Sequence, residues 1–86
     1  MANIASQEKR ILRTEREREE NRRYTSQVRT SFRRLRDAVE AGESERVASE
    51  QRLLASRVDK AVRSGALHRN SGARKKARAA RLARGA

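Results

Sequence analysis

YTSQVRTSFRRLRDAV, residues 24–39, carries the pattern that decides the fold. Its apolar residues recur at spacings of four, four, three and four, which places them on one face of a helix. They are Tyr24, Val28, Phe32, Leu35 and Val39. A helix with a single apolar stripe is stabilised by burying that stripe. The stretch therefore predicts a helix that packs against other elements of the chain.

The segment before this stripe is polar on every side. RTEREREENRR, residues 13–23, contains no apolar residue, so no core can hold it. Like-charge pairs at i,i+4 oppose a helix there, and an attractive pair contributes only a few tenths of a kcal/mol. We predict one long first helix over about residues 6–41, whose first half extends away from the packed part and frays without a partner.

A second helix is predicted over about residues 45–63. EAGESE at 40–45 predicts the turn before it, with Gly42 as a left-handed cap of the first helix and Ser44 as the cap of the second. Leu53 is expected to widen the apolar stripe of this helix. The stripe itself consists of Val47, Leu54, Val58 and either Ala61 or Val62.

A third helix is predicted over about residues 71–83, capped by Asn70 or Ser71. Its inward face is expected to consist of small residues, with Leu82 or Ala83 at its end: Ala73, Ala77 and Ala80. Strand patterns are missing, and short connections between amphipathic helices imply antiparallel neighbours. The predicted fold class is all-α: one domain, residues 1–86, forming a three-helix bundle with a long, extended first helix.

Charge dominates the composition. The 86 residues include 23 Lys and Arg against 11 Asp and Glu, a net charge of +12. Asp59 is the last acid, and residues 65–86 carry seven cations. A basic surface that only aids solubility is the simpler alternative, but a charge this high and this uneven favours binding of a polyanion.

Catalytic chemistry has little support in the sequence. His68 is the only histidine, cysteine is absent, and the four glycines are too scattered to form a phosphate-binding loop. We predict no enzymatic activity, no small-molecule substrate, no cofactor and no metal site. No signal peptide or membrane-spanning run is evident, so we expect an intracellular protein without membrane contact.

Three classes of polyanion were weighed. The Ala-rich ARKKARAARLARGA, residues 73–86, lacks the large apolar face that binding to anionic lipid requires. A nucleoid-type DNA-coating protein stays open as the alternative. Because helix-turn-helix spacing and base-stacking aromatics are missing, recognition of folded RNA through phosphates and shape is favoured.

Several motifs resemble the ribosomal protein S20 family of the bacterial small subunit. They are MANI at the start, Lys9-Arg10, the turn EAGE at 40–43 and, above all, GALHRNSGARKKAR at 65–78. The resemblance implies a three-helix bundle in the cytoplasmic small ribosomal subunit that joins early in assembly. Its implied partners are the 5′ domain and the penultimate stem of the small-subunit rRNA, with other subunit proteins at the periphery.

The resemblance also implies RNA contacts at named positions. In the N-terminal segment these are Asn3, Ser6, Lys9, Arg10 and Arg13. At the start of the third helix they are His68, Arg69, Asn70, Arg74, Lys75 and Lys76. The charge distribution adds Arg22, Arg23, Arg29, Arg33, Arg78 and Arg81.

Two of these expectations have alternatives. On residue type alone, His68 caps a helix or lies in solvent. The acids of the 13–23 stretch depart from the strongly basic first helix typical of the family, so this stretch faces RNA, solvent or a basic neighbouring protein. The acids in question are Glu15, Glu17, Glu19 and Glu20.

Overall fold

The computed structural model describes residues 2–85, with side chains from residue 4 onward. The chain forms three helices: α1 (Ala2–Ala41), α2 (Ser44–Arg63) and α3 (Arg69–Arg84). Within residues 2–85 there is no β-strand, which confirms the all-α class.

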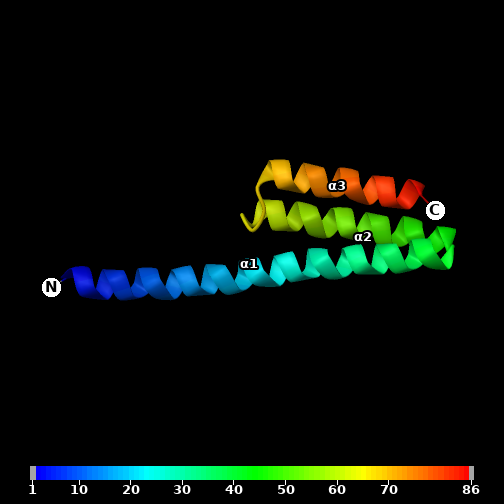
Figure 1. The fold of residues 1–86 in the computed structure, drawn as a ribbon. Coiled ribbons are helices and arrows are strands. Elements are labelled where there is room, and N and C mark those ends of the chain that lie inside the picture. The colour runs from blue at the N-terminus through cyan, green and yellow to red at the C-terminus, as the bar shows by residue number, and fades with distance from the viewer. Residues whose placement is uncertain (1, 86) are drawn as a thin grey trace.

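The first helix is as long as the molecule. A helix of 40 residues spans about 60 Å, and the longest dimension of the chain is 63 Å. Figure 1 shows that the N-terminal half of α1 projects beyond the other two helices. Side chains at positions 4–20 are all exposed. The predicted long, extended first helix is therefore confirmed, and it begins at Ala2 rather than near residue 6.

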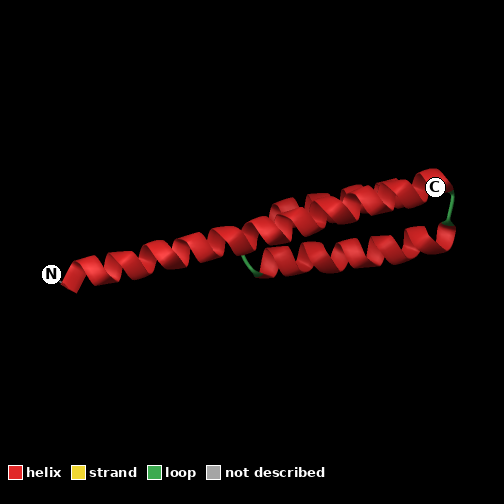
Figure 2. Cartoon of the chain, turned by 90° about the horizontal axis from the view of Figure 1, so that it is seen from below, coloured by secondary structure: helices red, strands yellow, loops and turns green. Residues whose placement is uncertain are grey.

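The C-terminal half of α1 forms the bundle with α2 and α3. α2 runs back along α1, and α3 then turns to run in the same direction as α1 (Figures 1 and 2). α2 packs against both other helices. The core is small and built largely from Val, Leu and Ala: Val28, Leu35, Ala38, Val47, Leu54, Val58, Ala61 and Ala79.

Glycines end the first two helices. Gly42 has a φ of +69°, the left-handed cap expected from the sequence. Its N–H bonds to the carbonyl of Val39 at 3.1 Å, and the N–H of Glu43 bonds to the carbonyl of Ala38 at 3.2 Å.

The predicted cap of α2 is wrong by one residue, because Glu43 occupies the cap position and Ser44 is the first helical residue.

The inward face of α3 differs in part from the prediction, although Leu82 and Ala83 do pack against the core as expected. Ala73 and Ala77 are exposed, and the buried positions are Gly72 and Ala79. The reason is close packing on α2: a Cβ atom at position 72 would lie 2.5 Å from Cγ2 of Val62. Only glycine leaves room for the backbone of α3 at this distance, so the helix turns this position inward.

Leu53 was expected to widen the stripe of α2, but its side chain is 38% exposed. The buried residues of α2 are Val47, Leu54, Val58 and Ala61, and Val62 packs beside them. Leu53 therefore lies beside the core rather than in it.

Candidate nucleic-acid interface

A groove between α1 and α3 gathers positive charge. It has a volume of about 430 Å³. Among the described residues, those that line it include no acid. The cations along it are Arg29, Arg33 and Arg36 from α1 and Lys75 and Arg78 from α3.

Helical spacing explains why these cations meet. Arg33 and Arg36 follow Arg29 by four and seven residues, which are positions on one helix face. Lys75 and Arg78 are three residues apart on α3 and likewise neighbours. Because α2 packs against both α1 and α3, it holds these two faces opposite each other across the groove.

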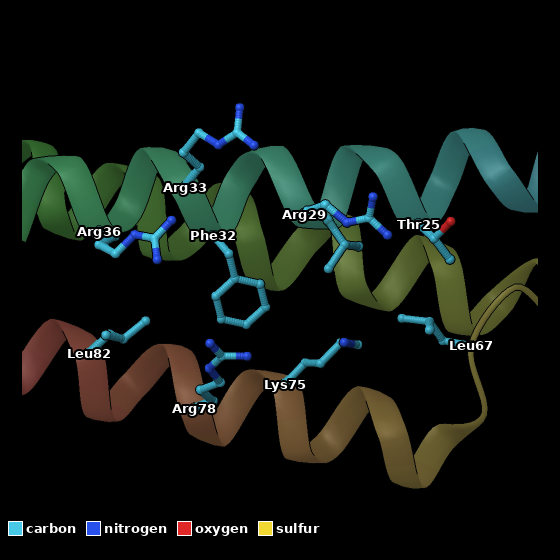
Figure 3. A pocket seen from close by; sticks show the side chains of 10 residues that line it. Thr25, Arg29, Phe32, Arg33, Arg36, Leu67, Lys75, Arg78 and Leu82 are labelled. Carbon is cyan, nitrogen blue, oxygen red and sulfur yellow. The ribbon is translucent and has the colours of Figure 1, made fainter.

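The floor of the groove is apolar. Phe32 projects from α1 toward α3, and Leu67 reaches in from the connection between α2 and α3 (Figure 3). The guanidinium carbon of Arg78 lies 5.1 Å from the centroid of the Phe32 ring. A cation–π contact of this kind contributes about 0.5–1 kcal/mol at an exposed site. It is one of the few contacts between α3 and α1.

A second groove lies between α1 and α2, with a volume of about 530 Å³. Hydroxyl and amide side chains of α1 line it together with a single acid, Glu19. Its cations are Arg22, Arg23, Arg34 and Arg57. Nε of Arg57 is buried and, among the described residues, has no hydrogen-bond partner. The middle of α1 is thus flanked by a basic groove on each side.

The start of α3 is capped by His68. Its backbone is extended, with φ of −70° and ψ of 148°, and its Nδ1 accepts a hydrogen bond from the N–H of Asn70 at 3.1 Å. The helix therefore begins at Arg69, and the predicted caps Asn70 and Ser71 lie inside it. His68, Arg69 and Asn70 are all exposed, so the cap leaves this corner accessible.

The remaining predicted residues of α3 divide into two kinds. Arg74 and Arg81 are exposed. Nζ of Lys76 lies 2.8 Å from Oδ1 of Asp59 on α2, and both side chains are about half exposed. The positive charge of Lys76 is therefore compensated within the chain.

None of the predicted N-terminal contacts with a described side chain lines either groove. Ser6, Lys9, Arg10 and Arg13 are exposed on the projecting half of α1, and Nε of Arg13 bonds to Glu17 at 3.2 Å. Arg29 lies sixteen positions after Arg13, which corresponds to about 24 Å along a helix. Asn3 belongs to α1, but its side chain is outside the described part of the chain.

Of the cations and aromatic residues that line the grooves, four were not among the predicted RNA contacts: Phe32, Arg34, Arg36 and Arg57. The position of Arg36, seven residues after Arg29, was a usable signal. Arg57 gave none, because α2 is nearly neutral overall and nothing in its sequence shows which of its arginines faces α1.

In the part of the chain that the structure describes, no three His, Cys, Asp or Glu side chains come together as metal ligands would. Within the same residues, none of the helices combines the length and the apolar character needed to cross a bilayer.

Known proteins resemble this chain over nearly its whole length. The family described as "Ribosomal protein S20" matches residues 2–84. "Small ribosomal subunit protein bS20" of Frankia casuarinae is 46% identical over 94% of this chain and 91% of the relative. The protein of the same name from Beutenbergia cavernae is 39% identical over 99% of this chain and 99% of the relative. That from Acaryochloris marina is 42% identical over 100% of this chain and 99% of the relative.

These relatives are named as ribosomal proteins, which supports the prediction that this chain is not an enzyme. They match across all three helices, including the His68 corner and the basic third helix. With a family match over residues 2–84 and identities of 39–46%, the chain belongs to the ribosomal protein S20 family.

Proposed function

We propose that this protein is a structural constituent of the small ribosomal subunit that binds small-subunit rRNA directly. The observation that carries the proposal is the α1–α3 groove, which presents five cations and, among the described residues, no acid. A groove of one charge sign attracts a polyanion and concentrates it there. Membership of a ribosomal protein family supports rRNA as that polyanion.

The two grooves suggest how the protein stabilises folded RNA. Each places arginines along a different side of the middle of α1, and the guanidinium fork binds phosphate oxygens in pairs. Release of counterions from the bound phosphates supplies much of the affinity. Two RNA segments held in separate grooves of one bundle are fixed relative to each other. The 5′ domain and the penultimate stem are the segments that we propose.

Salt dependence of binding tests the proposal. We would titrate a 5′-domain rRNA transcript at several salt concentrations with the triple variant Arg29→Gln, Arg33→Gln and Lys75→Gln. Loss of three phosphate contacts reduces the slope of log K against log salt by about 2–3. The matched control removes three exposed cations of α2 and should leave the slope nearly unchanged: Arg46→Gln, Arg52→Gln and Arg63→Gln.

Equal slopes for the two triple variants would show that the groove is not the RNA site. A comparison with duplex DNA of similar length at matched salt separates the proposal from a nucleoid-type DNA-coating role. We expect clear preference for the folded transcript, and equal affinity for DNA would contradict the ribosomal function.

A further inference from the structure

Phosphate binding does not account for the whole α1–α3 groove. Its cations line a space whose floor is apolar, formed by Val28, Phe32, Leu67 and Leu82. A regular RNA duplex presents a charged backbone, which would meet the cations and leave this floor uncovered. An apolar floor with convergent charged groups is the form of a site that encloses a ligand.

The floor contains a cation–π pair formed by Phe32 and Arg78. Phe32 is one of two aromatic residues in the chain and is only half-buried. The guanidinium group of Arg78 lies over its ring at 5.1 Å (Figure 3). Unpaired bases stack on aromatic rings and on arginine planes. The Phe32 ring and the Arg78 guanidinium plane are therefore two groups on which an unpaired base could stack.

Size and charge agree with a nucleotide. The volume of about 430 Å³ lies within the range of about 300–1,000 Å³ that small-molecule sites occupy. Arg29 lies on α1 along one side of the groove, and Lys75 lies across from it on α3 (Figure 3). Arg33 also lines the groove, at its outer edge, with its side chain directed away from α3. These cations are placed to meet the phosphates on either side of a base that enters between the helices.

We propose that the groove receives a single unpaired nucleotide of the bound RNA. The base lies on the apolar floor against the Phe32–Arg78 pair, and its flanking phosphates bind Arg29, Arg33 and Lys75. This inference rests on the proposed RNA-binding function and adds to it a preference for RNA with an extruded base.

The test compares two RNA duplexes with the same base pairs. One carries an additional, bulged 2-aminopurine, and the other is fully paired. Stacking of one base predicts roughly 5- to 100-fold tighter binding of the bulged duplex. The fluorescence of the 2-aminopurine should fall as it stacks in the groove. Equal affinity for the two duplexes, with no fluorescence change, would overturn the inference.

Two variants separate stacking from charge. Phe32→Leu keeps an apolar side chain but removes the ring, and Arg78→Lys keeps the charge but removes the plane. Each should lose most of the preference for the bulge, while affinity for the paired duplex changes by no more than about twofold. Arg52→Lys, on the exposed side of α2, is the matched control and should keep the preference. Thermal unfolding by circular dichroism shows whether each variant is folded.

Three outcomes count against the inference in different ways. Retention of the bulge preference in both variants would exclude the Phe32–Arg78 pair as the binding surface. Tight binding of free AMP without a preference among the duplexes would reassign the groove to free nucleotides and overturn the inference. Salt-dependent rRNA binding with no bulge preference would overturn only the inference, whereas failure to bind any RNA would overturn the proposed function itself.

Discussion

The ammonium group of Lys76 donates a hydrogen bond to the carboxylate of Asp59 at 2.8 Å, and so links α3 to α2. Asp59 is also the last acid of the chain. One cation of the most basic helix is therefore neutralised by the helix against which it packs. Because both side chains are about half exposed, this pair is a weak contact at the surface between the two helices.

Replacing Asp59 with asparagine should release Lys76. Because both side chains are about half exposed, we expect a loss of unfolding free energy of only a few tenths of a kcal/mol. The freed ammonium can bind one more phosphate, so the salt slope of RNA binding should steepen by up to about 1. Glu45→Gln, an exposed acid of α2, is the control that removes the same charge. Equal steepening in both variants would indicate a general charge effect.

Leu54 should be essential to the core, and the adjacent Leu53 should not. Leu54 is fully buried, whereas Leu53 is 38% exposed. We expect Leu54→Ala to lower the unfolding free energy by about 2–5 kcal/mol, a large part of what a domain of this size has. Leu53→Ala should cost less than about 1 kcal/mol. Urea unfolding followed by circular dichroism measures both, and similar losses would contradict the described core.

Gly72→Ala should destabilise the protein although alanine favours helix. The gain in helix propensity is about 1 kcal/mol, but the new methyl group would lie 2.5 Å from Cγ2 of Val62. Valine has little rotamer freedom, and overpacking costs about 1–3 kcal/mol, so we expect a net loss of about 1 kcal/mol. Adding Val62→Ala should make the pair less destabilised than the sum of its single changes, as a double-mutant cycle would show. Strict additivity would argue against the close contact.

His68→Ala should weaken the first turn of α3. The variant loses the hydrogen bond from the N–H of Asn70 to Nδ1, which is 3.1 Å long, and loss of such a cap costs about 0.5–2 kcal/mol. His68→Asn retains a capping side chain and should recover most of the stability. Amide hydrogen exchange at Asn70 measures the effect directly. Unchanged exchange in the alanine variant would show that the imidazole does not cap the helix.

The projecting half of α1 should be the least protected part of the chain. Side chains at positions 4–20 are exposed and contribute nothing to the core, and local opening is easiest where buried contacts are few. Amides there should exchange far faster than those near Leu35 and Leu54. Binding of the 5′-domain transcript should slow them. Uniform protection along α1 in the free protein would contradict this prediction.

The apolar spacing of residues 24–39 was enough to predict that this stretch is a helix with one buried face. Val28 and Leu35 are buried as that spacing requires, because a helical period fixes which residues share a face. The same logic failed for α3, where the alanines at positions 73 and 77 repeat at helical spacing yet face solvent. Alanine is compatible with either side of a helix, so the close approach at Gly72 decided the orientation instead.

The candidate site could be predicted only in part. Charge pattern picked out Arg29, Arg33 and Arg78, and the family resemblance added Lys75; the structure gathers all four in one groove. It could not show that Phe32 leaves part of its ring on the groove floor, since core and floor positions share one helical spacing. Nor could it show that Lys76 is paired with Asp59, because that contact joins residues 17 positions apart.

The continuity of α1 has a geometric consequence. Its outer cations and its bundle residues belong to one uninterrupted helix, so the angle between them is set by the number of residues in between. Inserting one residue near position 20 would swing Lys9 and Arg13 by about 100° around the axis. Inserting seven would restore their direction to within about 20° and lengthen the arm by about 10 Å. The number of residues in this stretch therefore determines the direction in which the cations of the projecting half of α1 point relative to the bundle.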